Sequence, residues 1–445
     1  MSNAIEPTLL QGGRVVDPAS GHDGVADILI GADGHIVELA PGLADQCPAR
    51  TQIVDVSGRL VVPGFVDLHT HLREPGHEYK ETVETGSASA VAGGFTTILC
   101  MANTNPVNDN GAVTRYIVSQ SEACGLARVL PIGALSHGME GKKLAEIGDM
   151  LANGAVAVSD DGLPVMDAHL MRRALEYCAG LGVPVIAHEE DTCLSGGCMN
   201  EGRVSTLLGL RGIPDAAEDV LVSRDIILAE LTGGHLHVAH VSTAGAVRLI
   251  REAQARGVHV TTEVTPHHFT LTDEAVVGYD PDTRMAPPLR SEEARQAVVE
   301  GLRDGTICCI ATDHAPHSTI EKEVEFELSA CGVVGLETAW GLTYRLVQQG
   351  ELDLMTAVRL LTSGPSQCFG LKTGTLGPGV AADLVVIDLD ASTPVEVDEF
   401  HSRSRNSPFK GWELPSRIER TLFGGRTVYL WDGAEGRVGA EATAR

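Results

Sequence analysis

The sequence lacks long hydrophobic runs and is short of positive charge. No uninterrupted apolar stretch approaches the roughly 18 residues of a membrane span, and residues 1–7 lack the basic and apolar segments of a signal peptide. Acidic residues outnumber Lys and Arg by 60 to 33, which gives a formal net charge of -27. This charge argues against nucleic acid and anionic membranes as partners. We therefore expect a cytoplasmic protein with neither a nucleic-acid nor a membrane partner.

Paired cysteine motifs are also absent. The ten cysteines are scattered, and none forms a C-x-x-C pair. This spacing favours free thiols in a reducing compartment. Cys308 and Cys309 are adjacent in an apolar run, so we predict that they lie on opposite faces of one strand and form no disulfide bridge.

Both ends of the chain are rich in predicted β-strands. Residues 8–61 alternate short apolar segments with turn signals, such as the Asp33-Gly34 turn. A similar pattern returns near the C-terminus in GPGVAADLVVIDLD and TLFGGRTVYLWDG. We predict one small β-sandwich formed by both termini, with residues 1–61 and 371–445 as its two parts. Residues 62–370 would form a second domain between them.

The middle of the chain alternates strands and helices. Helix-like segments separate eight apolar strand signals, at residues 64–68, 96–102, 129–135, 155–162, 184–191, 235–242, 259–268 and 306–317. This alternation is typical of an α/β fold of the parallel (β/α)8 TIM barrel type. A length of 445 residues fits one such barrel with a small added domain. The longest irregular stretch, residues 192–214, is either a lid or partner contact or an inert insertion.

Residues able to bind metals recur where these strands end. His69 and His71 are two residues apart, so both imidazoles point to one face of the first strand. Other strands end in Asp160 and Asp161, His188, His240, Asp313 and His317. Barrel active sites lie at the carboxyl ends of the strands, and histidines with carboxylates suit zinc or a similar divalent ion. One aspartate can bridge two such ions because a carboxylate has two oxygens.

Eight motifs follow one another along the chain: PGFVDLHTHLREPG, MANTNP, SDDG, HEED, HVSTAG, EVTPHH, PPLR and ATDHAPH. As an ordered set they resemble the amidohydrolase superfamily, and within it the class I dihydroorotases. The resemblance implies a distorted (β/α)8 TIM barrel with a small β-sandwich domain. It also implies a zinc-dependent cyclic amide hydrolase, which converts N-carbamoyl-L-aspartate reversibly to L-dihydroorotate in pyrimidine (UMP) biosynthesis.

The same resemblance implies two Zn2+ ions per chain. It aligns His69, His71 and Asp313 with the ligands of one ion, His188 and His240 with those of the other, and Asp161 with the bridge between them. The alignment of SDDG to the family selects Asp161 over Asp160, whereas the spacing alone leaves both open. Many relatives bridge their metals with a carboxylated lysine instead. The fourth strand, AVAVSDDG, contains no lysine, which favours class I dihydroorotases over hydantoinases.

Catalytic and substrate-binding roles also follow from the resemblance. Asp313 would take a proton from the attacking hydroxide and pass it to the leaving amide nitrogen. Substrate-binding positions of the family align with His71, Arg73, Asn103, His317, Cys331 and Gly332. Arg73 would pair with the substrate's α-carboxylate through two hydrogen bonds. For His267 and His268, packing and support of the site are both open.

Two positions of the expected substrate site depart from the family pattern. Ala286 stands before PPLR, where the family usually has a substrate-contacting Asn, and Cys331 stands where Pro or Phe is commoner. The alanine loses about 0.5–1.5 kcal/mol for each hydrogen bond that nothing replaces. Two other functions stay open: another cyclic amidase, such as an allantoinase or hydantoinase, and an inactive paralogue that scaffolds aspartate transcarbamoylase. A homodimer and a complex with that transcarbamoylase are the macromolecular partners to consider.

Overall fold

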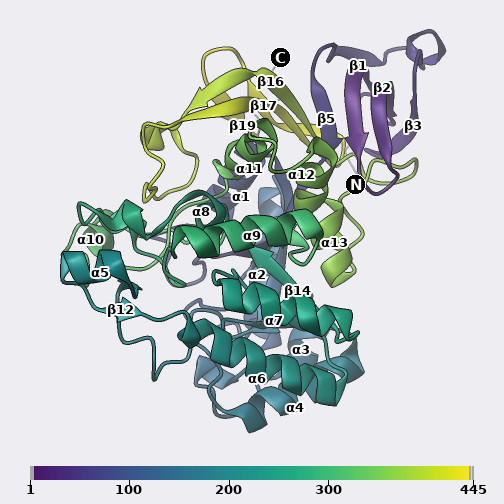
Figure 1. The fold of residues 1–445 in the computed structure, drawn as a ribbon. Helices are drawn as coiled ribbons and strands as arrows, with labels where there is room; N and C mark the ends of the chain where they lie inside the picture. Colours follow the sequence, from purple (N-terminus) through teal and green to yellow (C-terminus); the bar gives the residue numbers. More distant parts are fainter. Residues whose placement is uncertain (1–4, 440–441, 443–445) are drawn as a thin grey trace.

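Eight parallel strands form the centre of the structure, a computed structural model that describes residues 5–439 and 442 (Figure 1). Their order in the sheet is the order of the chain: β6 (Phe65–Thr70), β7 (Phe95–Cys100), β8 (Arg128–Gly133), β9 (Ala157–Ser159), β10 (Val185–Ala187), β13 (Leu236–Val238), β14 (Val260–Val264) and β15 (Cys309–Ile310). The first and last strands meet where Thr70 forms a parallel bridge with His314 and the His71 N–H donates to the His314 carbonyl at 2.8 Å. The predicted α/β barrel is confirmed.

The barrel closes around a small apolar interior. Side chains that point inward from the strands pack into one buried cluster, formed by Val66, Leu68, Leu99, Met101, Ile132, Ala157, Ile186, Ala239, Cys309 and Ala311. Filling the lumen with branched and apolar side chains is the usual packing of such barrels. The opposite faces of the strands pack against the helices, where Phe65 stacks on Trp340 with ring centroids 5.4 Å apart. Apolar side chains on both faces explain why the strand sequences read as continuous apolar runs.

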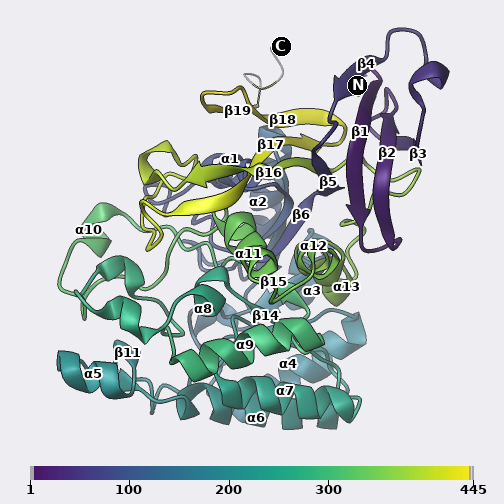
Figure 2. The same ribbon diagram turned by 45° about the horizontal axis from the view of Figure 1, so that its top comes forward.

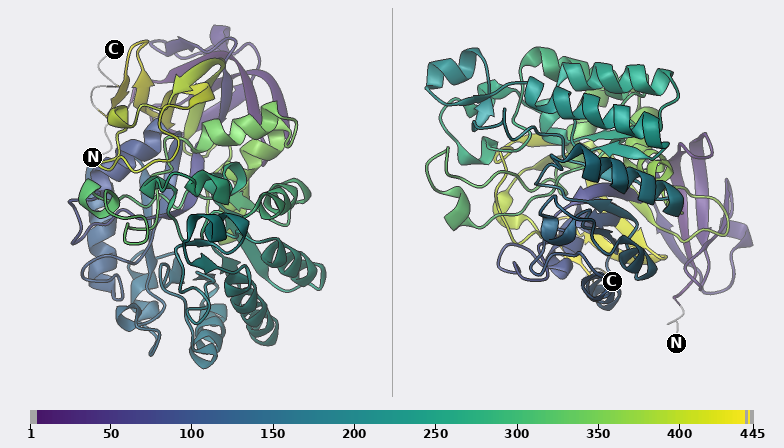
Figure 3. Two further views of the ribbon diagram at one scale, coloured as in Figure 1. Left: turned by 60° about the vertical axis from the view of Figure 1, so that its left-hand side comes forward. Right: turned by 90° about the horizontal axis from the view of Figure 1, so that it is seen from below.

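Helices cover the outside of the barrel, as Figure 3 shows for the ring of teal helices. The larger ones are α1 (Val83–Ala92), α2 (Gly111–Cys124), α4 (Ala168–Leu181), α6 (Ala216–Thr232), α7 (Ala244–Ala255), α9 (Glu292–Asp304), α11 (Ala339–Gln348) and α12 (Leu354–Leu361). The shorter ones are α3 (Ile147–Ala152), α5 (Arg203–Leu208), α8 (Pro266–Thr270), α10 (Thr319–Lys322) and α13 (Ser363–Phe369). Several of these helices have capping residues at their ends. The Asp167 side chain accepts hydrogen bonds from the first turn of α4, and Gly182 ends that helix in the left-handed region.

A second sheet joins the two ends of the chain. Its strands are β1 (Thr8–Asp17), β2 (His22–Ile30), β3 (Ile36–Ala40), β4 (Gln52–Asp55), β5 (Leu60–Pro63), β16 (Leu384–Pro394), β17 (Glu413–Phe423), β18 (Arg426–Trp431) and β19 (Gly436–Val438). Strand β5 connects the halves, because it pairs with β1 on one side and with β16 on the other (Figure 2). The prediction of a β-rich domain built from both termini is therefore confirmed. The domain limits after residues 61 and 370 stay a prediction.

The stretch that we expected to be irregular, residues 192–214, contains the short strands β11 (Met199–Asn200) and β12 (Gly212–Ile213) and helix α5. It has an apolar cluster of its own, in which Met199 and Val204 pack against Val276 and Phe326 from later loops. Arg290 donates a hydrogen bond to the Ile213 carbonyl at 2.9 Å, which anchors this stretch to the PPLR segment. In the part of the chain that the structure describes, no helix is long and apolar enough to cross a membrane.

Candidate metal centre

The predicted metal ligands lie together at the carboxyl ends of the barrel strands. His69 is the next-to-last residue of β6, and the other residues lie within three positions of the end of a strand: His71 after β6, Asp161 after β9, His188 after β10, His240 after β13 and Asp313 after β15. All six are buried. The ring centroids of His69 and His240 are 5.2 Å apart, although 171 residues separate them in sequence. The barrel therefore converges these side chains on one place, as its topology predicts.

Asp161 lies between two sets of imidazoles. Its Oδ2 is 3.1 Å from His69 Nε2 and 3.4 Å from His71 Nε2. Its Oδ1 is 3.3 Å from His240 Nε2 and 3.5 Å from His188 Nδ1. Asp313 adds a second carboxylate to the first set, with Oδ1 3.0 Å from His71 Nε2. One carboxylate with an oxygen facing each set of nitrogens is the arrangement that a bridging ligand requires.

The neighbouring aspartate has a different environment. Asp160 accepts hydrogen bonds from the Ser136 backbone N–H at 2.9 Å and from the Ser136 hydroxyl. These bonds hold its carboxylate against the loop after β8, so it supports the backbone. The two aspartates that the spacing left open are thus distinguished by direction, because only Asp161 faces the histidines.

An unsatisfied polar atom of the centre fits a metal ion. His69 Nε2, which faces Asp161, is buried and has no hydrogen-bond partner among the described residues. Two groups of ligand atoms lie within 4.8 Å of one another: His69, Asp161 and His240, and His69, His71 and Asp313. Imidazole nitrogens and carboxylate oxygens form a ligand set suited to zinc and similar divalent ions. The residues present therefore fit the metal that the fold family implies.

Electrostatics keep both carboxylates of the centre ionised. Burial opposes ionisation of Asp161, but His69, His188 and His240 outweigh it and hold the pKa of Asp161 well below its ordinary value. The same competition at Asp313, between burial and the nearby His69 and His71, lowers the pKa of that carboxyl as well. Ionised carboxylates are the forms that bind cations.

A second layer of buried residues holds His69, and the sequence patterns did not reveal it. Glu263 on β14 places Oε1 2.6 Å from His69 Nδ1 and Oε2 3.2 Å from His237 Nε2. A carboxylate behind a ligating histidine sets its tautomer and raises its basicity. The available signal was a lone acidic residue in an apolar strand, within EVTPHH. His237 had no comparable signal.

Asp67 ties the first strand to the last. Its carboxylate accepts hydrogen bonds from the Thr312 hydroxyl at 2.6 Å, from the Thr312 backbone N–H, and from the His69 backbone N–H at 3.0 Å.

The backbones of His240 and Asp313 adopt positive φ angles of 32° and 47°. Such conformations cost about 1–3 kcal/mol each and cluster at functional sites. The surrounding bonds hold strained backbone in position at two of the candidate ligands.

The predicted substrate-binding residues lie around the edge of this centre. His71 Nδ1 is 2.9 Å from Asn103 Oδ1, so Asn103 supports a candidate ligand directly. The buried Arg73 donates to the Pro316 carbonyl at 3.2 Å and lies 3.4 Å from His317 Nε2. The same His317 Nε2 donates to the Cys331 carbonyl at 2.8 Å. Next to it, the Gly332 N–H donates to the Arg284 carbonyl at 3.0 Å.

The two histidines of EVTPHH have different surroundings. His268 bonds to the Thr265 hydroxyl at 2.7 Å and donates to the Pro287 carbonyl at 3.0 Å, so it holds the segment that follows Ala286. His267 is buried, and its Nε2 has no hydrogen-bond partner among the residues described. Burial lowers the pKa of His267 to about 4, which keeps the imidazole neutral.

Comparisons with known proteins agree on one family. A Dihydro-orotase-like family model matches residues 58–246, and an Amidohydrolase family model matches residues 228–429. The curated dihydroorotase of Anaeromyxobacter sp. (strain K) is 56% identical over 423 residues, which cover 94% of this chain and 97% of that protein. The dihydroorotase of Geobacter metallireducens is 52% identical over 422 residues, which cover 95% and 99%.

Solved structures of hydantoinases share the fold. The L-hydantoinase (dihydropyrimidinase) from Arthrobacter aurescens has a TM-score of 0.86 at 26% identity, over 98% of each chain. The D-hydantoinase from Thermus sp. has a TM-score of 0.83 at 25% identity, over 98% of this chain and 97% of that one. The identity to the curated dihydroorotases is much higher than the identity to these hydantoinases. It confirms the dihydroorotase family, which the ordered motifs predicted. The chain belongs to the dihydroorotase family of the amidohydrolases.

Proposed function

We propose that this protein is a zinc-dependent dihydroorotase, which interconverts N-carbamoyl-L-aspartate and L-dihydroorotate in the cytoplasm as a step of pyrimidine biosynthesis. The observation that carries the proposal is the position of Asp161, whose two oxygens face two separate sets of histidines. Relatives named dihydroorotase that are 52% and 56% identical support the choice of substrate. The missing lysine on β9 is consistent with a bridge made by aspartate alone.

Six residues would hold the two ions: His69, His71, Asp161, His188, His240 and Asp313. Zinc bound by these residues would supply a Lewis acid for the amide carbonyl and would lower the pKa of a bound water molecule. Asp313 Oδ1 lies 3.0 Å from His71 Nε2 within the centre, and its carboxylate would accept a proton from the attacking water. In ring opening it then delivers this proton to the leaving amide nitrogen. In ring closure the proton moves the other way, and net consumption of a proton makes low pH favour dihydroorotate.

Arg73 and His317 would bind the carboxylate end of the substrate. The hydrogen bond from Arg73 to the Pro316 carbonyl orients its guanidinium group, which can then pair with a carboxylate through two hydrogen bonds. Burial and the nearby cations lower the pKa of His317 to about 3, so this imidazole is neutral. Because its Nε2 donates to Cys331, its buried Nδ1 remains an acceptor and has no partner among the described residues. That atom suits an N–H group of the substrate. Asn103, Cys331 and Gly332 complete the proposed substrate site.

Turnover of L-dihydroorotate by zinc-loaded protein tests the proposal. We expect Asp313→Asn to lower kcat by about 10²–10⁴-fold, the contribution of a positioned acid-base group. Metal content is measured in the same samples, since Asp313 is also a proposed ligand. Unchanged turnover in the variant would remove Asp313 from proton transfer. Absence of turnover in wild-type protein that holds two zinc ions would contradict the proposed activity.

Parallel assays separate the other candidate functions. Hydantoin and allantoin are offered beside dihydroorotate, because hydantoinases share the fold and Ala286 alters a position that the family uses for substrate. An inactive scaffold would turn over none of the three. Light scattering of the protein alone, and mixed with an aspartate transcarbamoylase, tests for a homodimer and for that complex.

A further inference from the structure

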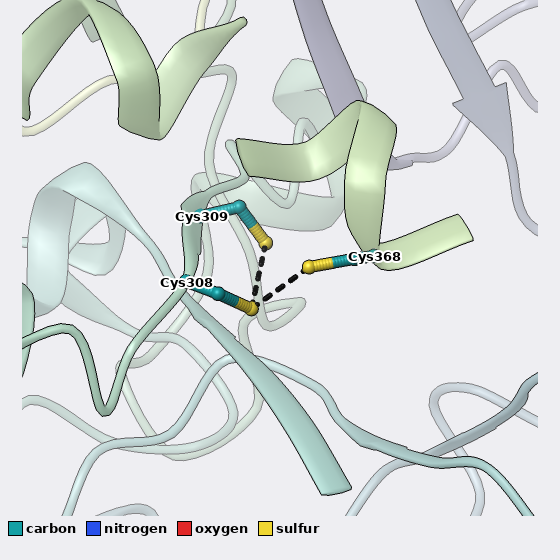
Figure 4. Close-up of side chains that lie close together, drawn as sticks. All are labelled: Cys308, Cys309 and Cys368. Atoms are coloured by element: carbon teal, nitrogen blue, oxygen red, sulfur yellow. Dashed lines mark hydrogen bonds between the residues drawn. The ribbon is translucent and has the colours of Figure 1, made fainter. Parts of the chain in front are cut away.

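Three cysteine thiols meet at the amino end of β15, away from the candidate metal centre. Cys308 directly precedes β15, Cys309 begins it, and Cys368 comes from α13. Cys308 Sγ is 2.9 Å from Cys368 Sγ and 4.0 Å from Cys309 Sγ. Figure 4 shows the three thiols pointing toward one another from the two elements. The sequence contains no C-x-x-C motif that would have revealed this cluster.

One earlier expectation about these residues is wrong. Strand alternation predicted that Cys308 and Cys309 face opposite sides of one strand, but both sulfurs belong to the same cluster. The alternation fails because Cys308 lies outside β15, where its backbone is not held in the pleated ladder. No disulfide was predicted, and all three cysteines are free thiols in the structure.

The arrangement suits a thiophilic metal ion. All three sulfurs lie within 4.8 Å of one another. Zn–S bonds of about 2.3 Å in tetrahedral geometry separate the sulfurs by about 3.8 Å, which lies between the two measured separations. One thiolate is also favoured before any ion binds. The contacts with Cys309 and Cys368 lower the pKa of the Cys308 thiol, while burial and the contact with Cys308 raise the pKa of Cys309.

The cluster is partly exposed at the level of its residues. Cys309 is buried, whereas Cys308 and Cys368 are half-buried. His237 lies beside Cys309, but its Nε2 is 3.2 Å from Glu263, which in turn holds His69. A water ligand in the fourth position leaves that chain of bonds intact. Neutral thiols can deprotonate when the ion binds, with release of protons to solvent.

We propose that Cys308, Cys309 and Cys368 form a second metal site, which binds one thiophilic divalent ion such as Zn2+ through three thiolates and one water molecule. The ion links β15 to α13. The site joins the last barrel strand to the helix that leads toward the C-terminal strands. An ion that binds only the folded state stabilises that state. This site shares no ligand with the dihydroorotase centre, and its test does not rely on turnover.

Cobalt(II) loading of the full-length protein under a phosphine reductant tests the site. Thiolate ligands give Co(II) an intense near-ultraviolet charge-transfer absorption, which the histidine and carboxylate ligands of the barrel mouth cannot produce. We expect this absorption in the wild type, its loss in Cys308→Ser and Cys368→Ser, and its retention in Cys124→Ser, a half-buried cysteine on α2. Its absence from the wild type, or its retention in the two site variants, would overturn the proposal.

A measurement on the wild type guards against variants that fail to fold. The reduced protein is alkylated with iodoacetamide in the presence and absence of Zn2+, and the labelled cysteines are identified by mass spectrometry. Zinc should protect Cys308 and Cys368, while the exposed Cys193 and Cys331 serve as internal controls. Equal labelling of Cys308 and Cys368 with and without zinc would refute the site.

Discussion

Replacing Glu263 by glutamine tests whether this carboxylate tunes His69. The change keeps the shape of the side chain and an oxygen 2.6 Å from His69 Nδ1, but it removes the negative charge. Burial disfavours that charge, yet His69 and His237 lower the pKa of Glu263 to about 2. A charged hydrogen bond contributes about 1.5–3 kcal/mol and a neutral one about 0.5–1.5 kcal/mol. The difference of about 1–2 kcal/mol predicts a roughly 5- to 30-fold weaker affinity for the ion held by His69.

Competition with a chromophoric chelator measures that affinity, and turnover of dihydroorotate at saturating zinc measures the consequence for activity. Glu337→Gln is the matched control, because Glu337 is a half-buried carboxylate that also accepts several hydrogen bonds, but from Ser89 and the backbone of His401 and Ser402. The control should bind zinc like the wild type. If Glu263→Gln is folded and its zinc affinity stays within twofold of the wild type, then the contact with His69 does not tune the metal ligand.

Three further predictions address the bridge, the anion site and Glu337. Asp161→Asn should lower the zinc content of purified protein by about half or more, since it removes a charge between both histidine sets. Asp160→Asn should retain zinc, because Asp160 is bonded to Ser136. Equal metal content of the two variants by elemental analysis would contradict the assignment of Asp161 as the bridge. Arg73→Lys should raise KM for dihydroorotate about 10-fold or more with a smaller change in kcat, because lysine cannot form the paired contact. An unchanged KM would exclude a paired contact between Arg73 and the substrate carboxylate. Burial raises the pKa of Glu337 to about 7 from 4.5, so the folded state binds the extra proton and unfolding free energy should fall by about 3 kcal/mol between pH 4.5 and 7. Denaturant titrations of wild type and Glu337→Gln should differ by that pH dependence, and parallel curves would refute it.

Much of the fold could be predicted because local patterns carry it. The eight predicted strands correspond to β6–β10 and β13–β15. The short strands β11 and β12 were not predicted, and they lie in a stretch that we expected to be irregular. Apolar runs of that length, separated by capped helices, leave few other topologies. Residues 199–213 were missed because their two-residue strands are too short to show a period.

The sequence by itself determined the order of the elements, the family, and the set of residues that end the strands, since these depend on local pattern and on which residue types occur in which order. Only the tertiary structure decided which atoms face one another. Asp161 faces the histidines, whereas its neighbour Asp160 bonds to Ser136. Glu263 contacts His69, 194 positions away in sequence. Cys308 contacts Cys368, 60 positions away. The physical reason is that a side chain's direction at a strand end depends on backbone torsions and on distant partners. No period in the sequence records either one.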